Sequence, residues 1–181
     1  MTSPHNVGGF EMTCTLILMR HSYAADGQSC RDFDRELTVA GTQLASDTGR
    51  LLNELCVVPD LIITSAAART VQTGQCVAEK LESDTVQLIT RLDLYQAPPA
   101  VYLSEIHLET TSVTSTVLCI GHNPGIEMLI SSLAGQRLSV SPATAGVFEI
   151  AIADWFKLPS LSSENSQLTH LIVGAQLSSM N

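Results

Sequence analysis

The sequence predicts an α/β fold with a mainly parallel β-sheet that is covered by helices on both faces. Short apolar runs of strand character alternate along the chain with segments of helical periodicity, which is the pattern of such folds. The first run, TLILMRH at residues 15–21, is apolar without interruption as far as Arg20, as is typical of a strand buried on both faces. With 181 residues, 45% of them hydrophobic and 15% charged, the chain can bury a sizeable core.

One domain is expected over residues 13–181, because this stretch shows neither an internal repeat nor a linker. Residues 1–12, MTSPHNVGGFEM, contain glycine, serine and proline and are expected to form a disordered tail. A polar loop over residues 22–37 follows the first strand, and a helix is expected from about Thr38, a favourable N-cap residue.

The middle of the chain repeats the alternation of strand and helix. The expected elements are a strand at 59–66, a helix at 68–81, a short strand at 86–91 and a weaker helix at 99–109. In the helix at 68–81, the periodicity places Val71, Gln75, Ala78 and Leu81 on one face.

The stretch from residue 116 to residue 135 is the clearest strand–helix unit. The strand is expected at 116–121, and Asn123 is expected to cap a helix whose first residue is Pro124, the favoured position for proline. Gly135 is expected to end that helix. Two further strands are predicted at 145–153 and 169–176.

The charge of the chain excludes several kinds of partner. The formal net charge is −9, from nine Lys and Arg against eighteen Asp and Glu, so nucleic acid and anionic membranes are not expected partners. No apolar run has the length needed to span a bilayer, and the first residues do not have the pattern of a secretory signal. The five cysteines show no CxxC spacing and are expected to be reduced, which together predicts a cytoplasmic protein.

Cations and imidazoles gather where three predicted strands end. Arg20 and His21 follow the first strand, Arg69 enters the helix after the second, and His122 follows the strand at 116–121. Ligands of open α/β sheets bind beyond the carboxyl ends of the strands, and the helix start at Asn123 adds unpaired N–H groups there. Two guanidiniums, two imidazoles and a helix N-terminus suit a tetrahedral dianion such as phosphate.

The same residues offer a catalytic route. A neutral imidazole is a competent nucleophile toward phosphorus, and flanking cations stabilise the charge that develops on the phosphoryl oxygens. The chain contains no Cys-x5-Arg loop, no Walker sequence and no cluster of carboxylates suited to a metal. Histidine is therefore the best nucleophile that the sequence offers.

Several short motifs resemble those of the histidine phosphatase superfamily, and most closely its SixA-type branch of phosphohistidine phosphatases. The resemblance covers about residues 14 to 152, and the motifs come in the same order with similar spacing. They are LMRHS at 18–22, DRELTVAG at 34–41, SAAARTVQT at 65–73, LDLYQA at 92–97 and CIGHNPG at 119–125.

The resemblance implies a phosphoglycerate mutase-like three-layer α/β/α sandwich that works without a metal or an organic cofactor. His21 would be the nucleophile that becomes transiently phosphorylated, while Arg20, Arg69 and His122 would hold the phosphoryl group. Arg35, which matches the arginine of the branch's RPLT motif, would also line the pocket.

Two further residues complete the expected substrate-binding set. Ser22 stands where the family has glycine; its hydroxyl can donate, although a position that needs a positive φ would be strained. Asn123 joins the set because its helix start faces the same sheet edge.

The general acid is the weakest part of the match. The family's acid lies after the third strand, where Asp93 in LDLYQA is the one nearby carboxylate, in an imperfect register. A phosphoramidate releases an imidazole, which needs little help from an acid. The expected substrate is therefore phosphohistidine on a signalling protein, for example a histidine phosphotransfer domain. A small phosphorylated molecule hydrolysed as a phosphomonoester, or a non-catalytic phosphate-binding module, stays open as an alternative.

Overall fold

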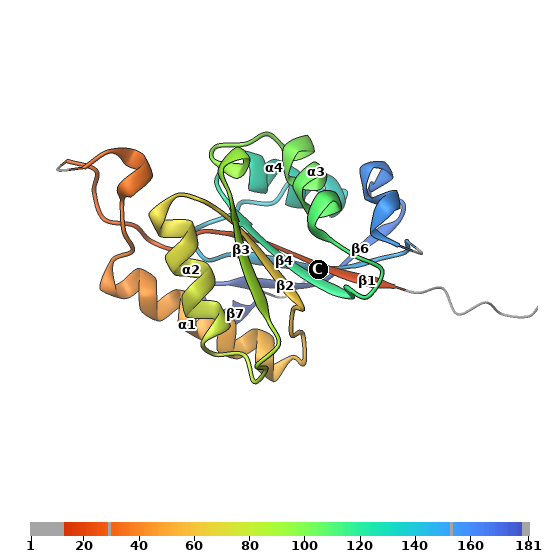
Figure 1. The fold of residues 1–181 in the computed structure, drawn as a ribbon, viewed down its shortest axis with the longest axis horizontal. Helices are drawn as coiled ribbons and strands as arrows, with labels where there is room; N and C mark the ends of the chain where they lie inside the picture. The colour runs from red at the N-terminus through yellow and green to blue at the C-terminus, as the bar shows by residue number, and fades with distance from the viewer. Residues whose placement is uncertain (1–12, 29, 153, 179–181) are drawn as a thin grey trace, which may run out of the picture.

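A mixed β-sheet forms the middle layer of the protein, with helices on both sides (Figure 1). The computed structural model describes residues 13–28, 30–152 and 154–178, so the tail expected at residues 1–12 lies outside the described residues. The strand order is β3-β2-β4-β1-β5-β6-β7. The strands are β1 (Cys14–Arg20), β2 (Leu61–Ser65), β3 (Gln87–Arg91), β4 (Thr116–Gly121), β5 (Ala145–Ile150), β6 (Ser166–Val173) and β7 (Gln176–Leu177).

The helices lie close to where the sequence predicts them. They are α1 (Val39–Glu54), α2 (Ala68–Ala78), α3 (Pro99–Glu109) and α4 (Gly125–Leu133), with short 3₁₀ turns η1 (Asp32–Asp34), η2 (Leu92–Leu94) and η3 (Trp155–Ser160). No helix in the described part of the chain is long and apolar enough to cross a membrane.

The prediction of a mainly parallel sheet is confirmed in part, because only one half of the sheet is parallel. β3, β2, β4 and β1 pair in parallel, whereas β5 is antiparallel to β1, β6 to β5 and β7 to β6. A parallel neighbour needs a crossover, usually a helix, and the chain between β5 and β6 forms only the short turn η3. The parallel half is the part that carries the candidate site.

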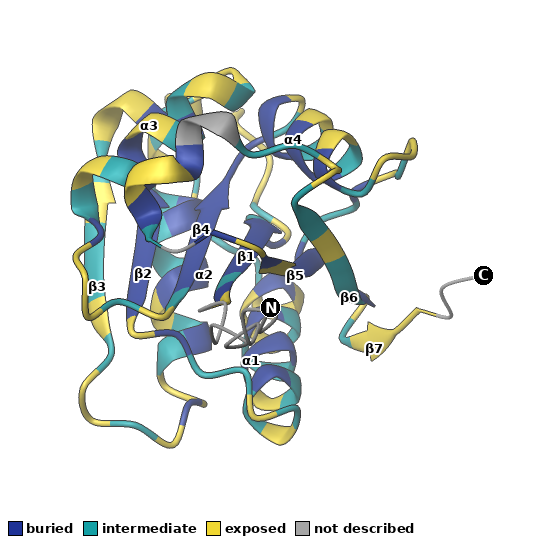
Figure 2. Ribbon diagram, turned by 90° about the vertical axis from the view of Figure 1, so that its right-hand side faces the viewer, coloured by how far each residue is buried: buried dark blue, intermediate teal, exposed yellow. Residues whose placement is uncertain are grey.

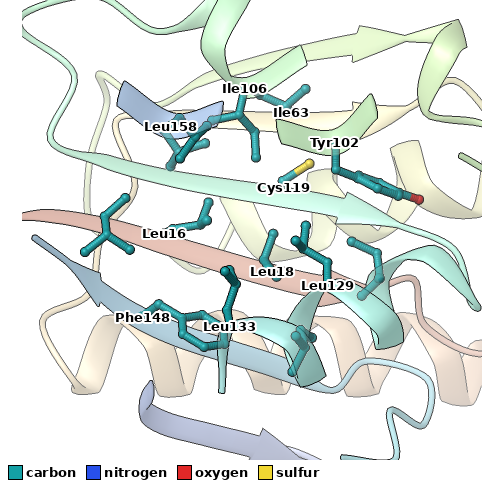
Figure 3. Close-up of a cluster of buried hydrophobic side chains, with 14 of the residues drawn as sticks. Leu16, Leu18, Ile63, Tyr102, Ile106, Cys119, Leu129, Leu133, Phe148 and Leu158 are labelled. Atoms are coloured by element: carbon teal, nitrogen blue, oxygen red, sulfur yellow. The ribbon is translucent and has the colours of Figure 1, made fainter. Parts of the chain in front are cut away.

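The sheet is buried on both faces, as the apolar run of β1 predicts. Successive side chains of a strand point to opposite faces. Leu16 and Leu18 join a core that contains Tyr102 of α3 and Leu129 of α4 (Figure 3). Their neighbours in β1, Ile17 and Met19, join a second core with side chains of α1 and α2. Figure 2 shows the central strands dark blue between the two layers, which gives the three layers of the predicted α/β/α sandwich.

Two of the predicted helix ends are confirmed and one is wrong. Thr38 caps α1, because its hydroxyl oxygen accepts a hydrogen bond from the Gly41 N–H at 2.9 Å. Gly135 ends α4 with φ +65°, a conformation that glycine adopts without strain. Asn123, however, does not cap α4: Pro124 is the N-cap residue and Gly125 the first helical residue. The Asn123 side-chain amide donates instead to the Val140 carbonyl and to Glu127 Oε2.

The buried face of α2 also differs from the prediction. Val71 and Ala78 are only partly buried and Gln75 is exposed, whereas Leu81 is buried as predicted but lies beyond the end of α2. The face against the sheet consists instead of Arg69, Thr70, Thr73, Gly74 and Val77. The two threonine hydroxyls donate to backbone carbonyls, which satisfies them inside the protein. A helix that carries a polar side chain into a site shows a weaker apolar stripe than one that only covers a core.

Candidate active site

Three neighbouring parallel strands deliver the predicted residues to one edge of the sheet. β4 lies between β2 and β1, and Arg20 at the end of β1 pairs in register with Gly121 at the end of β4. His21 and His122 therefore leave adjacent strands side by side, with their ring centroids 5.2 Å apart. Arg69, in the first turn of α2, reaches both rings.

His21 is held with one ring nitrogen facing Arg69. Its Nδ1 lies 2.7 Å from the carbonyl oxygen of Ser22, and a carbonyl can only accept, so Nδ1 carries the proton. Nε2 accepts a hydrogen bond from Arg69 Nε at 3.2 Å. Because an arginine N–H can only donate, Nε2 is the unprotonated nitrogen, and its electron pair accepts the hydrogen bond from Arg69.

His122 is anchored in the same way from the other side. Its Nε2 lies 2.9 Å from the Ser65 hydroxyl, and its Nδ1 lies 3.3 Å from an Arg69 terminal nitrogen, so Nδ1 is the acceptor. Its backbone N–H donates to the hydroxyl of Tyr102. In this state both ring nitrogens of His122 are occupied within the protein, and the ring orients Arg69.

Both imidazoles are neutral near neutral pH. Burial, followed by the charges of Arg69 and Arg20, lowers the pKa of His21 to about 4, against a raising effect of the Ser22 carbonyl. Burial, then His21 and Arg69, lowers the pKa of His122 to about 3. A neutral His21 keeps the electron pair that a nucleophile needs.

Arg20 presents donors that the protein does not use. One terminal nitrogen donates to the Val140 carbonyl at 2.8 Å. Its Nε is buried and has no partner among the described residues, although a buried N–H without an acceptor is costly. A bound oxyanion at the sheet edge would supply the missing acceptor.

The Ser22 side chain points into the protein interior, whereas the sequence predicted that it would bind substrate. Its side chain is fully buried, and its hydroxyl donates to the Gly41 carbonyl at 2.7 Å, while its N–H donates to Thr73. Ser22 is also not one of the residues with positive φ in the described chain, so the strain considered for this position is absent. Its contribution to the site is the backbone carbonyl that fixes the His21 ring.

The remaining predicted residues lie at different distances from the site. Asn123 follows His122 directly, and its Oδ1 is buried without a partner among the described residues. Arg35 is partly buried at the rim, where it donates to the Ala25 carbonyl and to Asp32 Oδ1. Asp93 is exposed on η2. No hydrogen bond or ion pair in the described chain joins it to the site, and its charge acts on Glu105.

Two residues that sequence reasoning did not select complete the site. Asp32 Oδ2 accepts hydrogen bonds from the Tyr95 hydroxyl at 2.6 Å and from Arg69 at 3.0 Å. The Tyr95 ring packs edge-on against His122 with centroids 5.4 Å apart. The LDLYQA motif could have indicated Tyr95, which lies within it. For Asp32 the sequence shows only an acidic residue close to Arg35. No group of three or more ligating side chains that could hold a metal ion occurs in the part of the chain that the structure describes.

Comparisons with known proteins show which proteins this chain resembles. No family model matches the chain. A chloroplast protein of Arabidopsis thaliana without an assigned function is 28% identical over 155 residues, which are 81% of this chain and 71% of that protein. A solved SixA protein of Nakamurella multipartitia, described as a candidate phosphohistidine phosphatase, is 25% identical with a TM-score of 0.77, over 89% of this chain and 96% of that chain.

Two more SixA structures have the same fold. One, from Agrobacterium tumefaciens and also described as a candidate phosphohistidine phosphatase, is 26% identical with a TM-score of 0.73, over 88% of this chain and 97% of that chain. The other, a protein histidine phosphatase in complex with tungstate, is 18% identical with a TM-score of 0.72, over 88% of this chain and 97% of that chain.

In its fold and in the order of its site motifs, the chain is similar to the histidine phosphatase superfamily. Within the superfamily it resembles the SixA-type branch, as the motifs around His21 and His122 predict. The predicted resemblance to this superfamily and the α/β/α fold are thereby confirmed, as is the prediction of a phosphatase-type hydrolase.

Proposed function

We propose that this histidine phosphatase removes the phosphoryl group from phosphohistidine on a signalling protein, without a metal ion. The observation that carries the proposal is the state of His21. The Nδ1–H of His21 donates to the Ser22 carbonyl, and its Nε2 electron pair is directed toward Arg69. A second guanidinium, that of Arg20, lies at the same sheet edge with its Nε unpartnered in the described chain. A nucleophile and the cations that stabilise its target are thus in one place.

The reaction has two balanced steps. In the first, His21 Nε2 attacks phosphorus, the P–N bond to the substrate imidazole breaks, and the bonding electrons leave on that nitrogen, which takes a proton from water. In the second, a water oxygen attacks the phosphoryl group on His21, its proton passes to solvent, and the P–Nε2 bond breaks to return the neutral imidazole and release inorganic phosphate. Each step inverts the configuration at phosphorus.

The arginines supply the electrostatic part of catalysis. Arg69 Nε lies 3.2 Å from His21 Nε2, so it must pass to a phosphoryl oxygen as the new bond forms. Arg20 Nε has no partner in the described chain, so it can donate to a phosphoryl oxygen without breaking an existing hydrogen bond. His122, through its contact with Arg69 at 3.3 Å, keeps that guanidinium in place.

The absence of a suitable acid favours phosphohistidine over a phosphate ester. An alkoxide leaving group needs a proton donor in the transition state, whereas an imidazole is a far better leaving group. Asp93 is exposed, and no hydrogen bond or ion pair in the described chain joins it to the site residues. These are Arg20, His21, Arg69 and His122. Asp32 does contact the site, but the hydrogen bonds from Tyr95 and Arg35 hold its pKa below its usual range, so it is a poor proton donor.

The comparisons support the same substrate class. The proteins of Nakamurella and Agrobacterium are described as candidate phosphohistidine phosphatases, and a SixA protein of the same fold binds tungstate, a tetrahedral oxyanion. A phosphotransfer domain carries its phosphohistidine on a folded surface and therefore needs a nucleophile that this surface can reach; Arg20 and His21, at the end of β1, are both partly exposed.

The experiment compares phosphate release from a phosphohistidine peptide and from an aryl phosphate, for the wild type, His21→Ala and His170→Ala. His170 lies on β6, away from the site, and controls for loss of a histidine. We expect faster turnover of the peptide, its abolition in His21→Ala, and little change in His170→Ala. Turnover of the ester alone would identify a small-molecule phosphomonoesterase. Binding of phosphate without turnover of either substrate would identify a binding module.

A further inference from the structure

The two arginines of the pocket are in different states. Arg20 keeps a buried Nε without an acceptor in the described chain. Arg69, which is almost fully buried, has its donors engaged: Nε on His21, one terminal nitrogen on His122 and Asp32 Oδ2, and the other on the Asp32 carbonyl at 2.5 Å. The guanidinium that should bind a phosphoryl group thus already binds an anion of the same chain.

The Asp32 carboxylate is held on Arg69 by its surroundings. The Tyr95 hydroxyl donates to Oδ2 at 2.6 Å, and Arg35 donates to Oδ1 at 3.0 Å. The neighbouring Phe33 packs edge-on against the Tyr95 ring, with centroids 5.1 Å apart. These hydrogen bonds also hold the pKa of Asp32 below its usual range, so the carboxylate is ionised at any pH near neutral. Its side chain is 44% exposed, so it lies at the rim of the pocket.

A carboxylate and a phosphoryl group make the same kind of contact with a guanidinium, through N–H donors in a fixed fork. Arg69 has too few open donors to hold both anions along with the two histidines, and two anions at one guanidinium repel each other. We propose that Asp32 is an internal anion that occupies Arg69 until a phosphoryl group displaces it, an inference that rests on the proposed function. Asp32 thereby weakens the binding of every anion that needs Arg69 and restricts the site to ligands with the charge of a phosphoryl dianion.

The test is the affinity for inorganic phosphate, measured by calorimetry at fixed pH and ionic strength. The variants are Asp32→Asn, Tyr95→Phe and Asp34→Asn. Asp34 is the matched control, because it lies in the same turn and carries the same charge but pairs with the exposed Arg31 instead of Arg69. Tyr95→Phe leaves every charge in place and removes only the hydroxyl that holds the carboxylate.

We expect Asp32→Asn to bind phosphate about three- to tenfold more tightly than the wild type, in line with the strength of a partly exposed ion pair. Tyr95→Phe should bind about twofold more tightly, and Asp34→Asn should stay within about twofold of the wild type. Equal gains in Asp32→Asn and Asp34→Asn would show a general charge effect and overturn the proposal.

The remaining outcomes separate this proposal from the proposed function. Weaker or unchanged binding by Asp32→Asn, with the wild type binding phosphate, would show that Asp32 only positions Arg69, and the phosphatase would stand without the internal anion. Absence of phosphate binding in the wild type and in all three variants would remove the phosphate site itself, and both proposals with it. If Asp32→Asn does not fold, as checked by its thermal midpoint, Tyr95→Phe decides alone: unchanged affinity there would overturn the proposal.

Discussion

The backbone N–H of His122 donates to the hydroxyl of Tyr102 at 3.0 Å, and both groups are buried. The same hydroxyl explains the glycine before His122, because a Cβ at Gly121 would lie 2.3 Å from it. Tyr102 belongs to α3, which packs on the face of the sheet opposite to α2. The site is thus supported from both outer layers: α2 brings Arg69 to the imidazoles, and α3 fixes the strand end that carries one of them.

Tyr102→Phe should destabilise the protein by about 1–3 kcal/mol, because it leaves a buried N–H without an acceptor. Urea unfolding measures this free energy. Tyr23→Phe is the matched control, since the Tyr23 side chain is half exposed, and it should change the unfolding free energy by no more than about 0.5 kcal/mol. Equal effects of the two changes would mean that the Tyr102 hydroxyl does not support the strand end.

His21 and His122 should both stay neutral across the pH range of ordinary assays. Their lowered pKa values, about 4 and about 3, arise first from burial, so the rings should protonate only in acid. Titration of the ring C–H signals by NMR, assigned with His21→Asn, measures this directly. An inflection near pH 6.5 for His21 would contradict the neutral nucleophile, because half of the rings would then lack their electron pair near neutral pH.

The stability of the protein should fall as the pH drops from 6.5 to about 4 for the contribution of His21, and to about 3 for that of His122. In that window the unfolded chain protonates His21 and His122 while the folded protein does not, so the unfolded state gains protons and is favoured. Above pH 6.5 both states hold neutral rings, and below the folded pKa values both are charged, so the loss is confined to the window.

The size of this loss follows from the number of protons. Each buried histidine contributes a slope of up to about 1.4 kcal/mol per pH unit. We would compare the unfolding free energies of the wild type and His21→Asn at several pH values between 4 and 7. The difference between the two curves gives the contribution of His21, because the carboxylates titrate in both proteins. Parallel curves for the two proteins would show that His21 titrates alike in the folded and unfolded states.

Three of the residues that meet at the site, Arg20, His21 and His122, could be predicted from the sequence because they stand where apolar runs end. Arg20 is the last residue of β1, and His21 and His122 directly follow β1 and β4. The ends of neighbouring parallel strands must meet at one sheet edge. Asp32 and Tyr95 could not be found in this way. Their contact joins the loop after β1 to the turn after β3, and it depends on the path of that loop in space rather than on any local pattern.

The other corrections have a similar origin. Ser22 was expected in the substrate-binding set because it stands at the family's glycine position with a hydroxyl that can donate, yet that hydroxyl donates to the Gly41 carbonyl at 2.7 Å. Asn123 was expected to cap α4, yet its amide is used by Val140 and Glu127, which are brought near by the fold. In both cases residue type and position were compatible with two roles, and tertiary hydrogen bonds selected one of them.

Asp93→Asn distinguishes the two enzymatic interpretations of the site. If the leaving group is an imidazole, the change should alter turnover of a phosphohistidine peptide by less than about twofold, because Asp93 is exposed and none of its contacts in the described chain reaches His21 or Arg69. A true general acid contributes about 10²- to 10⁴-fold. The measurement is kcat/KM for the peptide and for an aryl phosphate, with Asp84→Asn, on the loop before β3, as a control of equal charge. A hundredfold loss on the ester in Asp93→Asn alone would show that a conformational change brings Asp93 to the leaving group, and the phosphomonoesterase would then be the better account of this site.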